Sequence, residues 1–152
     1  MINKKIQWKI LPFELITIND LYDILALREE VFALEQKCTA IDLDGLDKRA
    51  IHVIGKINEQ IMATARILPP NVYLKDKVSF GRLAIKKHLR GKGFGDELMD
   101  IIFQYIKSNF PGIPIEFSAQ LYLKTFYEKH GCTAFGAVYD DGGIPHIYMK
   151  CL

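Results

Sequence analysis

Residues 78–98, VSFGRLAIKKHLRGKGFGDEL, contain the features that decide the fold of this chain. A β-rich run at 78–85 leads into the glycine-rich turn 90–95, RGKGFG, and apolar residues then recur at helical spacing. The first turn of a helix carries unpaired N–H groups and a partial positive charge, and glycines allow a ligand to approach the backbone closely. The stretch therefore predicts a strand, a phosphate-binding turn and a helix in direct succession.

Positive charge gathers in this turn although the whole chain is nearly neutral. Lys and Arg number 20 and Asp and Glu number 18 over 152 residues, yet Lys86, Lys87, Arg90 and Lys92 lie together with no acidic residue between them. We expect Arg90 and Lys92 to add charge where a polyphosphate would bind. The near balance elsewhere argues against a nucleic-acid partner, because nucleic-acid-binding domains are strongly basic. A KH-type RNA-binding loop is disfavoured because a strand, not a helix, precedes the turn.

The composition predicts one domain over residues 1–152, because 49% of the residues are hydrophobic and a chain of this length can bury a sizeable core.

The three cysteines, Cys38, Cys132 and Cys151, form no CxxC pair. We therefore expect neither a disulfide framework nor a zinc site, and we infer a reducing, cytoplasmic compartment. No apolar run is long enough to predict a membrane span, and the N-terminus lacks the apolar core of a signal peptide, so we expect no membrane partner.

Periodicity outside the turn predicts an α/β (α+β) domain with a mixed central sheet flanked by helices, in the order β-α-β-β-β-α-β-α-β-β. The expected segments are a strand at 5–10, a helix that begins after Thr17, strands at 51–57, 61–68 and 78–85, a long helix after the turn, a strand at 115–119, a short helix near 121–130, and strands at 133–139 and 145–151. Residues 140–143, DDGG, are expected to form the last turn. Exposed strand edges would allow a homodimer to form.

The polar segment 37–50 contains Asp42, Asp44 and Asp47 but lacks the spacing and the final Glu of a calcium-binding loop. We therefore expect a surface loop and no metal site. An arginine inside an apolar strand, such as Arg66, needs an anionic partner. That partner is either a carboxylate of the substrate or an acidic side chain of this chain.

The glycine-rich turn also resembles a known motif. Arg90-x-x-Gly93-x-Gly95, preceded by Ile85 at the end of a strand, is similar to the acyl-CoA pyrophosphate loop of the GNAT N-acetyltransferase superfamily. The expected order of elements is also similar to that fold. The segments that resemble its ElaA-like branch in particular are LREEVFALEQKC (27–38), LDGLD (43–47), ARIL (65–68), GRLAI (81–85) and GIPHI (143–147).

This resemblance implies an N-acetyltransferase that moves an acetyl group from acetyl-CoA directly to a primary amine of a small molecule, peptide or protein. The alternative is a non-catalytic acyl-CoA-binding or sensor module on the same fold. Gln120 stands where the family usually has Asn, and Cys132 where it usually has Phe. The residues implied to bind the cofactor are Leu83, Ala84, Ile85, Arg90, Gly91, Lys92, Gly93, Phe94, Gly95, Gln120, Phe126 and Tyr127.

Acetyl transfer needs a base for an amine that is protonated at neutral pH and a proton donor for the leaving thiolate. Tyr127 is the candidate acid, His146 the first candidate base and Glu35 the second. No base near Cys38 supports a nucleophilic role for that thiol. Tyr127 as a core aromatic, and the histidines as structural residues, remain open alternatives. The residues expected to contact the substrate are Arg28, Glu35, His52, Arg66, Arg82 and His146.

Overall fold

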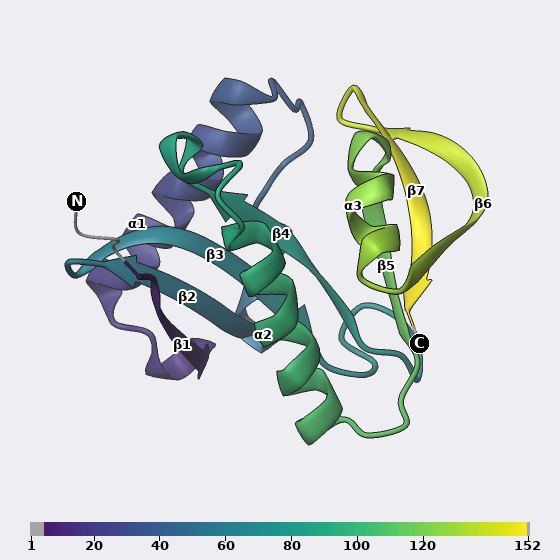
Figure 1. Ribbon diagram of the computed structural model, residues 1–152, viewed down its shortest axis with the longest axis horizontal. Helices are drawn as coiled ribbons and strands as arrows, with labels where there is room; N and C mark the ends of the chain where they lie inside the picture. Colours follow the sequence, from purple (N-terminus) through teal and green to yellow (C-terminus); the bar gives the residue numbers. More distant parts are fainter. Residues whose placement is uncertain (1–4, 152) are drawn as a thin grey trace.

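The computed structural model describes residues 5–151, and its strands and helices follow the predicted order (Figure 1). The elements are β1 (Gln7–Pro12), α1 (Ile18–Arg28), β2 (Ile51–Ile57), β3 (Gln60–Leu68), β4 (Ser79–Ile85), α2 (Phe94–Asn109), β5 (Ile115–Gln120), α3 (Lys124–Lys129), β6 (Cys132–Asp141) and β7 (Ile144–Cys151). The last turn is shorter than predicted, because the ends of β6 and β7 leave only Gly142 and Gly143 between them.

Helix α1 does not end at Arg28 but changes its winding. It continues as a π-helical segment, Glu29–Glu35, after which the Gln36 N–H donates to the Val31 carbonyl at 3.0 Å. Single turns of this kind are rare within helices and are frequent at functional sites. The segment carries the chain from α1 toward the acidic loop 37–50.

The strands form two antiparallel sheets that meet at one point. The order is β1-β2-β3-β4 in the first sheet and β5-β7-β6 in the second. Val78, just before β4, bridges Ile115 in parallel, donating to the Pro114 carbonyl at 2.9 Å and accepting from the Glu116 N–H at 3.0 Å. Beyond this bridge β4 and β5 diverge, as Figure 1 shows. Among the described residues, 5–151, one edge of β4 therefore has no strand partner beyond this bridge.

The two long helices cover opposite faces of the first sheet because successive strand residues point to opposite sides. Val53 packs in the cluster that contains Leu98 and Ile102 of α2. Its neighbour Ile54 packs with Ile24 of α1. In Figure 1, α2 crosses in front of the first sheet and α3 lies in front of the second. Within residues 5–151, no helix is long and apolar enough to cross a membrane.

A β-bulge interrupts β4 beside the point of divergence. Arg66 of β3 pairs with Gly81, but Thr64 pairs with Ala84, so β4 carries an extra residue there. Arg82 lies in the bulge with φ at 53°, a left-handed conformation that side chains rarely adopt. Bulges bend a strand and redirect its side chains, and they are frequent next to active sites. The bulge therefore takes the Arg82 side chain out of the regular alternation of side chains along β4.

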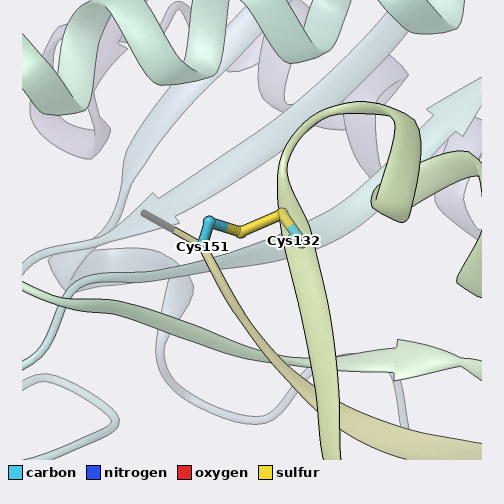
Figure 2. The surroundings of a disulfide bond; sticks show 2 residues. All are labelled: Cys132 and Cys151. Atoms are coloured by element: carbon cyan, nitrogen blue, oxygen red, sulfur yellow. A yellow bond between two sulfur atoms is a disulfide. The ribbon is translucent and has the colours of Figure 1, made fainter.

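The expectation that the cysteines would stay unpaired is wrong for two of them. Cys132 begins β6 and Cys151 ends β7, and the two residues lie opposite each other in the strand register. Their Cα atoms are 4.1 Å apart, and their sulfur atoms form a disulfide bond (Figure 2). Cys38 has a free thiol. The pairing depends on register, so the spacing of cysteines along the chain does not reveal it.

Candidate functional site

A cavity of about 840 Å³ lies where β4 and β5 diverge. Its size falls in the usual range of small-molecule sites. The predicted cofactor-binding residues that line it are Leu83, Ile85, Arg90, Gly91, Gly95, Gln120, Phe126 and Tyr127. Ala84 is buried in the core, and Lys92, Gly93 and Phe94 lie outside the cavity wall. Most of the predicted cofactor contacts therefore come together at one cavity.

The glycine-rich turn leaves open space at the start of α2. Gly91 and Gly93 have φ angles of 75° and 87°, in the region that only glycine adopts readily, and Gly93 directly precedes the helix. A Cβ at either position would meet no atom within 4 Å, whereas one at Gly95 would lie 3.5 Å from the Phe126 ring. Free N–H groups and the positive end of a 16-residue helix face this space. The turn therefore fits a phosphate group.

Arg90 is held by Glu35 in a bidentate ion pair. Its Nη1 and Nη2 donate to the two carboxylate oxygens at 2.7 and 2.9 Å, and its Nε donates to the Ile85 carbonyl at 3.0 Å. The hydrogen bond from Arg90 lowers the pKa of the Glu35 carboxyl. Carboxylates and phosphates bind the same guanidinium fork. Glu35 lies outside the cavity wall. Its carboxylate therefore binds the Arg90 guanidinium, which is the group that we expect to bind phosphate.

Gln120 is linked across the cavity to the end of the π-helical segment. Its side-chain amide exchanges two hydrogen bonds with the amide of Gln36, at 2.8 and 3.0 Å. The Gln36 Nε2 also donates to the Tyr122 hydroxyl at 2.9 Å. The neighbours Glu35 and Gln36 therefore hold two residues, Arg90 and Gln120, that were predicted to contact the cofactor.

Tyr127 belongs to the core and lines the cavity at the same time. Its side chain packs against Phe117 and Phe126, with ring centroids 4.7 and 5.2 Å away. Burial raises the pKa of the Tyr127 hydroxyl well above its ordinary value. The phenol is therefore protonated at neutral pH and can donate a hydrogen bond.

Buried arginines hold the acidic loop against the sheet. Arg28 Nη1 lies 2.7 Å and Arg66 Nη1 lies 3.1 Å from Asp47 Oδ1. Arg28 also contacts Asp42 at 2.8 Å, and Arg66 contacts Asp44 at 2.5 Å. Burial alone would raise the pKa of Asp47, but hydrogen bonds and charge from the two arginines outweigh it and lower that pKa. These arginines therefore pair with the loop, which was one of the two predicted outcomes.

Arg82 completes the network on the cavity side. Its Nε lies 2.8 Å from Asp42 Oδ1 without hydrogen-bond geometry, and its Nη2 donates to the Asp42 carbonyl at 3.1 Å. Arg66 and Arg82 line the cavity, whereas Arg28 does not. Within residues 5–151, no group of His, Cys, Asp and Glu side chains is arranged to hold a metal ion.

The two candidate histidines lie in different places. His52 is buried outside the cavity wall, and its Nε2 donates to the Asp47 carbonyl at 2.8 Å. Burial lowers the pKa of His52, which makes it a neutral support for the loop. His146 lines the cavity, and its Nδ1 lies 2.7 Å from the Ile144 carbonyl. Because a carbonyl only accepts, Nδ1 carries the hydrogen and the neutral ring keeps its lone pair on Nε2.

Several polar residues of the cavity were not predicted. Tyr73 comes from the connection between β3 and β4, Ser118 from β5, Tyr139 from β6 and Tyr148 from β7. Strand alternation places Tyr148 on the same face as His146, so periodicity could have identified that residue. The others depend on which strands pair and on the path of a connecting segment.

Comparison with known proteins identifies the family. A family model of the acetyltransferase (GNAT) domain matches residues 45–152. A UPF0039 protein of Synechocystis sp. is 39% identical over 146 residues, which cover 95% of this chain and 94% of that protein. Protein ElaA of Escherichia coli is 35% identical over 146 residues, which cover 95% of each.

Solved structures agree with this assignment. An acyl-CoA N-acyltransferase from Pseudomonas aeruginosa matches with a TM-score of 0.91 at 33% identity, covering 97% of this chain and 100% of that one. The crystal structure of Escherichia coli ElaA matches with a TM-score of 0.90 at 33% identity and the same coverage. The chain therefore belongs to the GNAT acyltransferase family, in its ElaA-like branch, whose fold implies an acyl-CoA donor and an acceptor substrate.

Proposed function

We propose that this protein transfers an acetyl group from acetyl-CoA directly to a primary amine. The observation that carries the proposal is the open glycine turn at the start of α2, which borders a cavity lined by Tyr127 and His146. Acetyl-CoA would supply an activated thioester, and the reaction exchanges its C–S bond for a C–N bond. The residues must therefore hold the donor, take a proton from the amine and give one to the sulfur.

The residues present fit the donor along its length. The turn at Gly91 and Gly93 would hold the pyrophosphate through N–H groups, with Arg90 at its side. The free edge of β4 would offer backbone groups of Leu83 and Ile85 to the amides of the pantetheine arm, as an added strand does. Both residues line the cavity.

The aromatic residues beneath the point of divergence favour a small acyl group. Phe80 and Phe117 lie with ring centroids 4.2 Å apart, and Tyr127 lies 4.7 Å from Phe117. The three rings are part of the core as well as the cavity wall. Closely packed rings leave little room for a long acyl chain at this end of the cavity.

Proton transfer would use two groups of the cavity wall, His146 and Tyr127. A free alkyl amine is mostly protonated at neutral pH, since its pKa is about 10.4. His146, with a lone pair on Nε2, would take that proton. Tyr127, which is neutral, would donate to the thiolate as the C–S bond breaks. The nitrogen loses a second proton as the C–N bond forms, and that proton would replace, through solvent, the one that Tyr127 gives to sulfur. The net reaction therefore converts an ammonium group and a thioester into an amide, a thiol and one released proton.

Binding and turnover test the proposal separately. At about 100 times its Kd, acetyl-CoA should stabilise the protein by about 2.7 kcal/mol and raise its Tm. Gly93→Glu should abolish this rise, whereas Gly112→Glu should retain it. Gly112 has φ at 76° and open surroundings but lies beyond the opposite end of α2, so it controls for backbone strain. A rise that persists in Gly93→Glu would exclude the proposed donor site.

Thiol release in the presence of primary amines tests catalysis. We expect free coenzyme A to accumulate at a rate that depends on the amine. Stabilisation by acetyl-CoA without thiol release from any amine would support the acyl-CoA-binding module and refute the transferase.

A further inference from the structure

The second sheet presents another cluster of side chains beside the expected donor contacts. On β5, Gln120 pairs with His146 and Ser118 pairs with Tyr148, so these residues share one face. Tyr139 of β6 pairs with His146 from the other side. All five residues line the cavity. Alternate residues of a strand are roughly 7 Å apart. Ser118 and Tyr148 therefore lie about 7 Å along the strands from Gln120 and His146.

The tyrosines of this cluster contact one another and remain uncharged. The rings of Tyr139 and Tyr148 stack with centroids 5.6 Å apart, and the hydroxyls of Tyr73 and Tyr148 lie 2.7 Å apart. The hydrogen bond with Tyr73 raises the pKa of Tyr148 to about 12, and burial raises the pKa of Tyr139. Neutral phenol rings attract cations through their faces.

A carboxylate without a partner lies next to these rings. The arginines that line the cavity are each paired with carboxylates, as described above. Asp141, at the end of β6, also lines the cavity and has no ion-pair partner within residues 5–151. It lies on the same face of β6 as Tyr139. This part of the wall therefore carries one carboxylate without a cationic partner beside the two phenol rings.

We propose that the acceptor is an aliphatic diamine, or a polyamine that contains this unit, and that its non-reacting ammonium group binds between Asp141 and the rings of Tyr139 and Tyr148. The proposal rests on the acetyltransferase function proposed above. The reacting amine must lose its proton before it attacks, and a nearby carboxylate opposes that loss. Asp141 therefore suits the second, non-reacting ammonium group, and the reacting amine lies at His146.

The strand register sets the length of the acceptor. Tyr139 pairs with His146, and Asp141 follows Tyr139 by two positions on the same strand. Two strand residues span roughly 7 Å, which corresponds to an acceptor with about four or five carbons between its nitrogens.

Three acceptors of matched length test the proposal. The compounds 1,4-diaminobutane, 1-aminopentane and 5-aminopentanoate place an ammonium, a methyl and a carboxylate group at the far end. We expect kcat/KM for the diamine to exceed that for 1-aminopentane by roughly five- to thirtyfold, the range from exposed to desolvated cation contacts, and 5-aminopentanoate to be the poorest acceptor. Equal values for the diamine and the monoamine would overturn the proposal.

A pair of variants locates the effect. Asp141→Asn should remove the advantage of the diamine, so that the ratio of kcat/KM for 1,4-diaminobutane to that for 1-aminopentane falls to about one. Asp100→Asn, an exposed change on α2, should keep that advantage. A diamine-to-monoamine ratio that is the same in Asp141→Asn and the wild type would refute the role of this carboxylate.

A binding measurement separates this proposal from the proposed function. With coenzyme A bound, 1,4-diaminobutane should raise the Tm of the wild type but not that of Asp141→Asn. If this rise is found while no acceptor releases thiol, the ammonium site stands and the acetyl transfer is refuted. If monoamines turn over as well as the diamine and no rise is found, acetyl transfer stands and the ammonium site is refuted.

Discussion

Asp47→Asn should lower the free energy of unfolding more than most substitutions that exchange one polar side chain for another of the same shape. Asp47 is 8% exposed and is bound by Arg28 and Arg66, which are 1% and 4% exposed. Asparagine keeps the shape of the side chain but removes its negative charge. The two buried guanidinium groups then share a partner that no longer compensates their charge.

The magnitude follows from this burial. Removing one partner of a buried ion pair costs about 3–5 kcal/mol, because an uncompensated charge stays buried. Asp42 and Asp44 still contact the arginines, so we expect the lower end, about 3 kcal/mol. For a chain of this size each kcal/mol lowers Tm by about 2–4 °C, which predicts a loss of roughly 6–12 °C.

Unfolding in urea and by heat measures the effect, with Asp23→Asn as the control. Asp23 is exposed on α1 and has no ion pair within residues 5–151. A loss below about 1 kcal/mol in Asp47→Asn, within the range of surface pairs, would refute the reasoning. So would an equal loss in the control.

The pH dependence gives an independent check. The native pKa of Asp47 is lowered, so its carboxylate stabilises the native state above the unfolded pKa, which is about 3.9. That contribution is lost as pH falls further toward the native pKa. The difference between the wild type and Asp47→Asn should therefore be full near about pH 6 and shrink below about pH 4.

Three further changes probe the cavity and the second sheet. Glu35→Gln should free Arg90 and lower the Kd of acetyl-CoA by about two- to fivefold, since the pair is partly exposed, and calorimetry showing unchanged or weaker binding would contradict this. Tyr127→Phe should lower kcat at least about tenfold with the Kd of acetyl-CoA retained, whereas an unchanged kcat would remove its role as acid. Replacing Cys132 and Cys151 together by Ser should cost about 2–4 kcal/mol in denaturant unfolding, and thiol titration should find one free thiol both before and after the change.

The elements of the fold were predicted from local patterns with small errors at their ends. The run 51–57 became β2 with the predicted bounds, because apolar side chains on both faces are packed under helices. The strand predicted at 133–139 extends to Cys132 and Asp141, because hairpin ends can pair residues that are typical of turns. The π-helical winding after Arg28 was not predicted, since helical periodicity does not distinguish it.

The candidate site was predicted in part. Arg90, Gly91 and Gly95 of the glycine-rich turn line one cavity together with Gln120, Tyr127 and His146, and their roles in binding and catalysis stay predictions. The partners that hold the predicted residues in place were not predicted, and Glu35 on Arg90 is the clearest example. Ion pairs between distant segments leave no periodic signal in a sequence.

By itself the sequence determined the features that depend on neighbours along the chain. These are the alternation of strands and helices and the glycine turn before α2, because backbone conformation and face polarity repeat over a few residues. Only the tertiary structure decided the features that depend on register and on the divergence of β4 from β5. These include the cavity, the Cys132–Cys151 disulfide and the placement of Asp141 beside Tyr139 and Tyr148. The physical reason is that a shift of one residue in strand pairing would reverse every side chain on those strands.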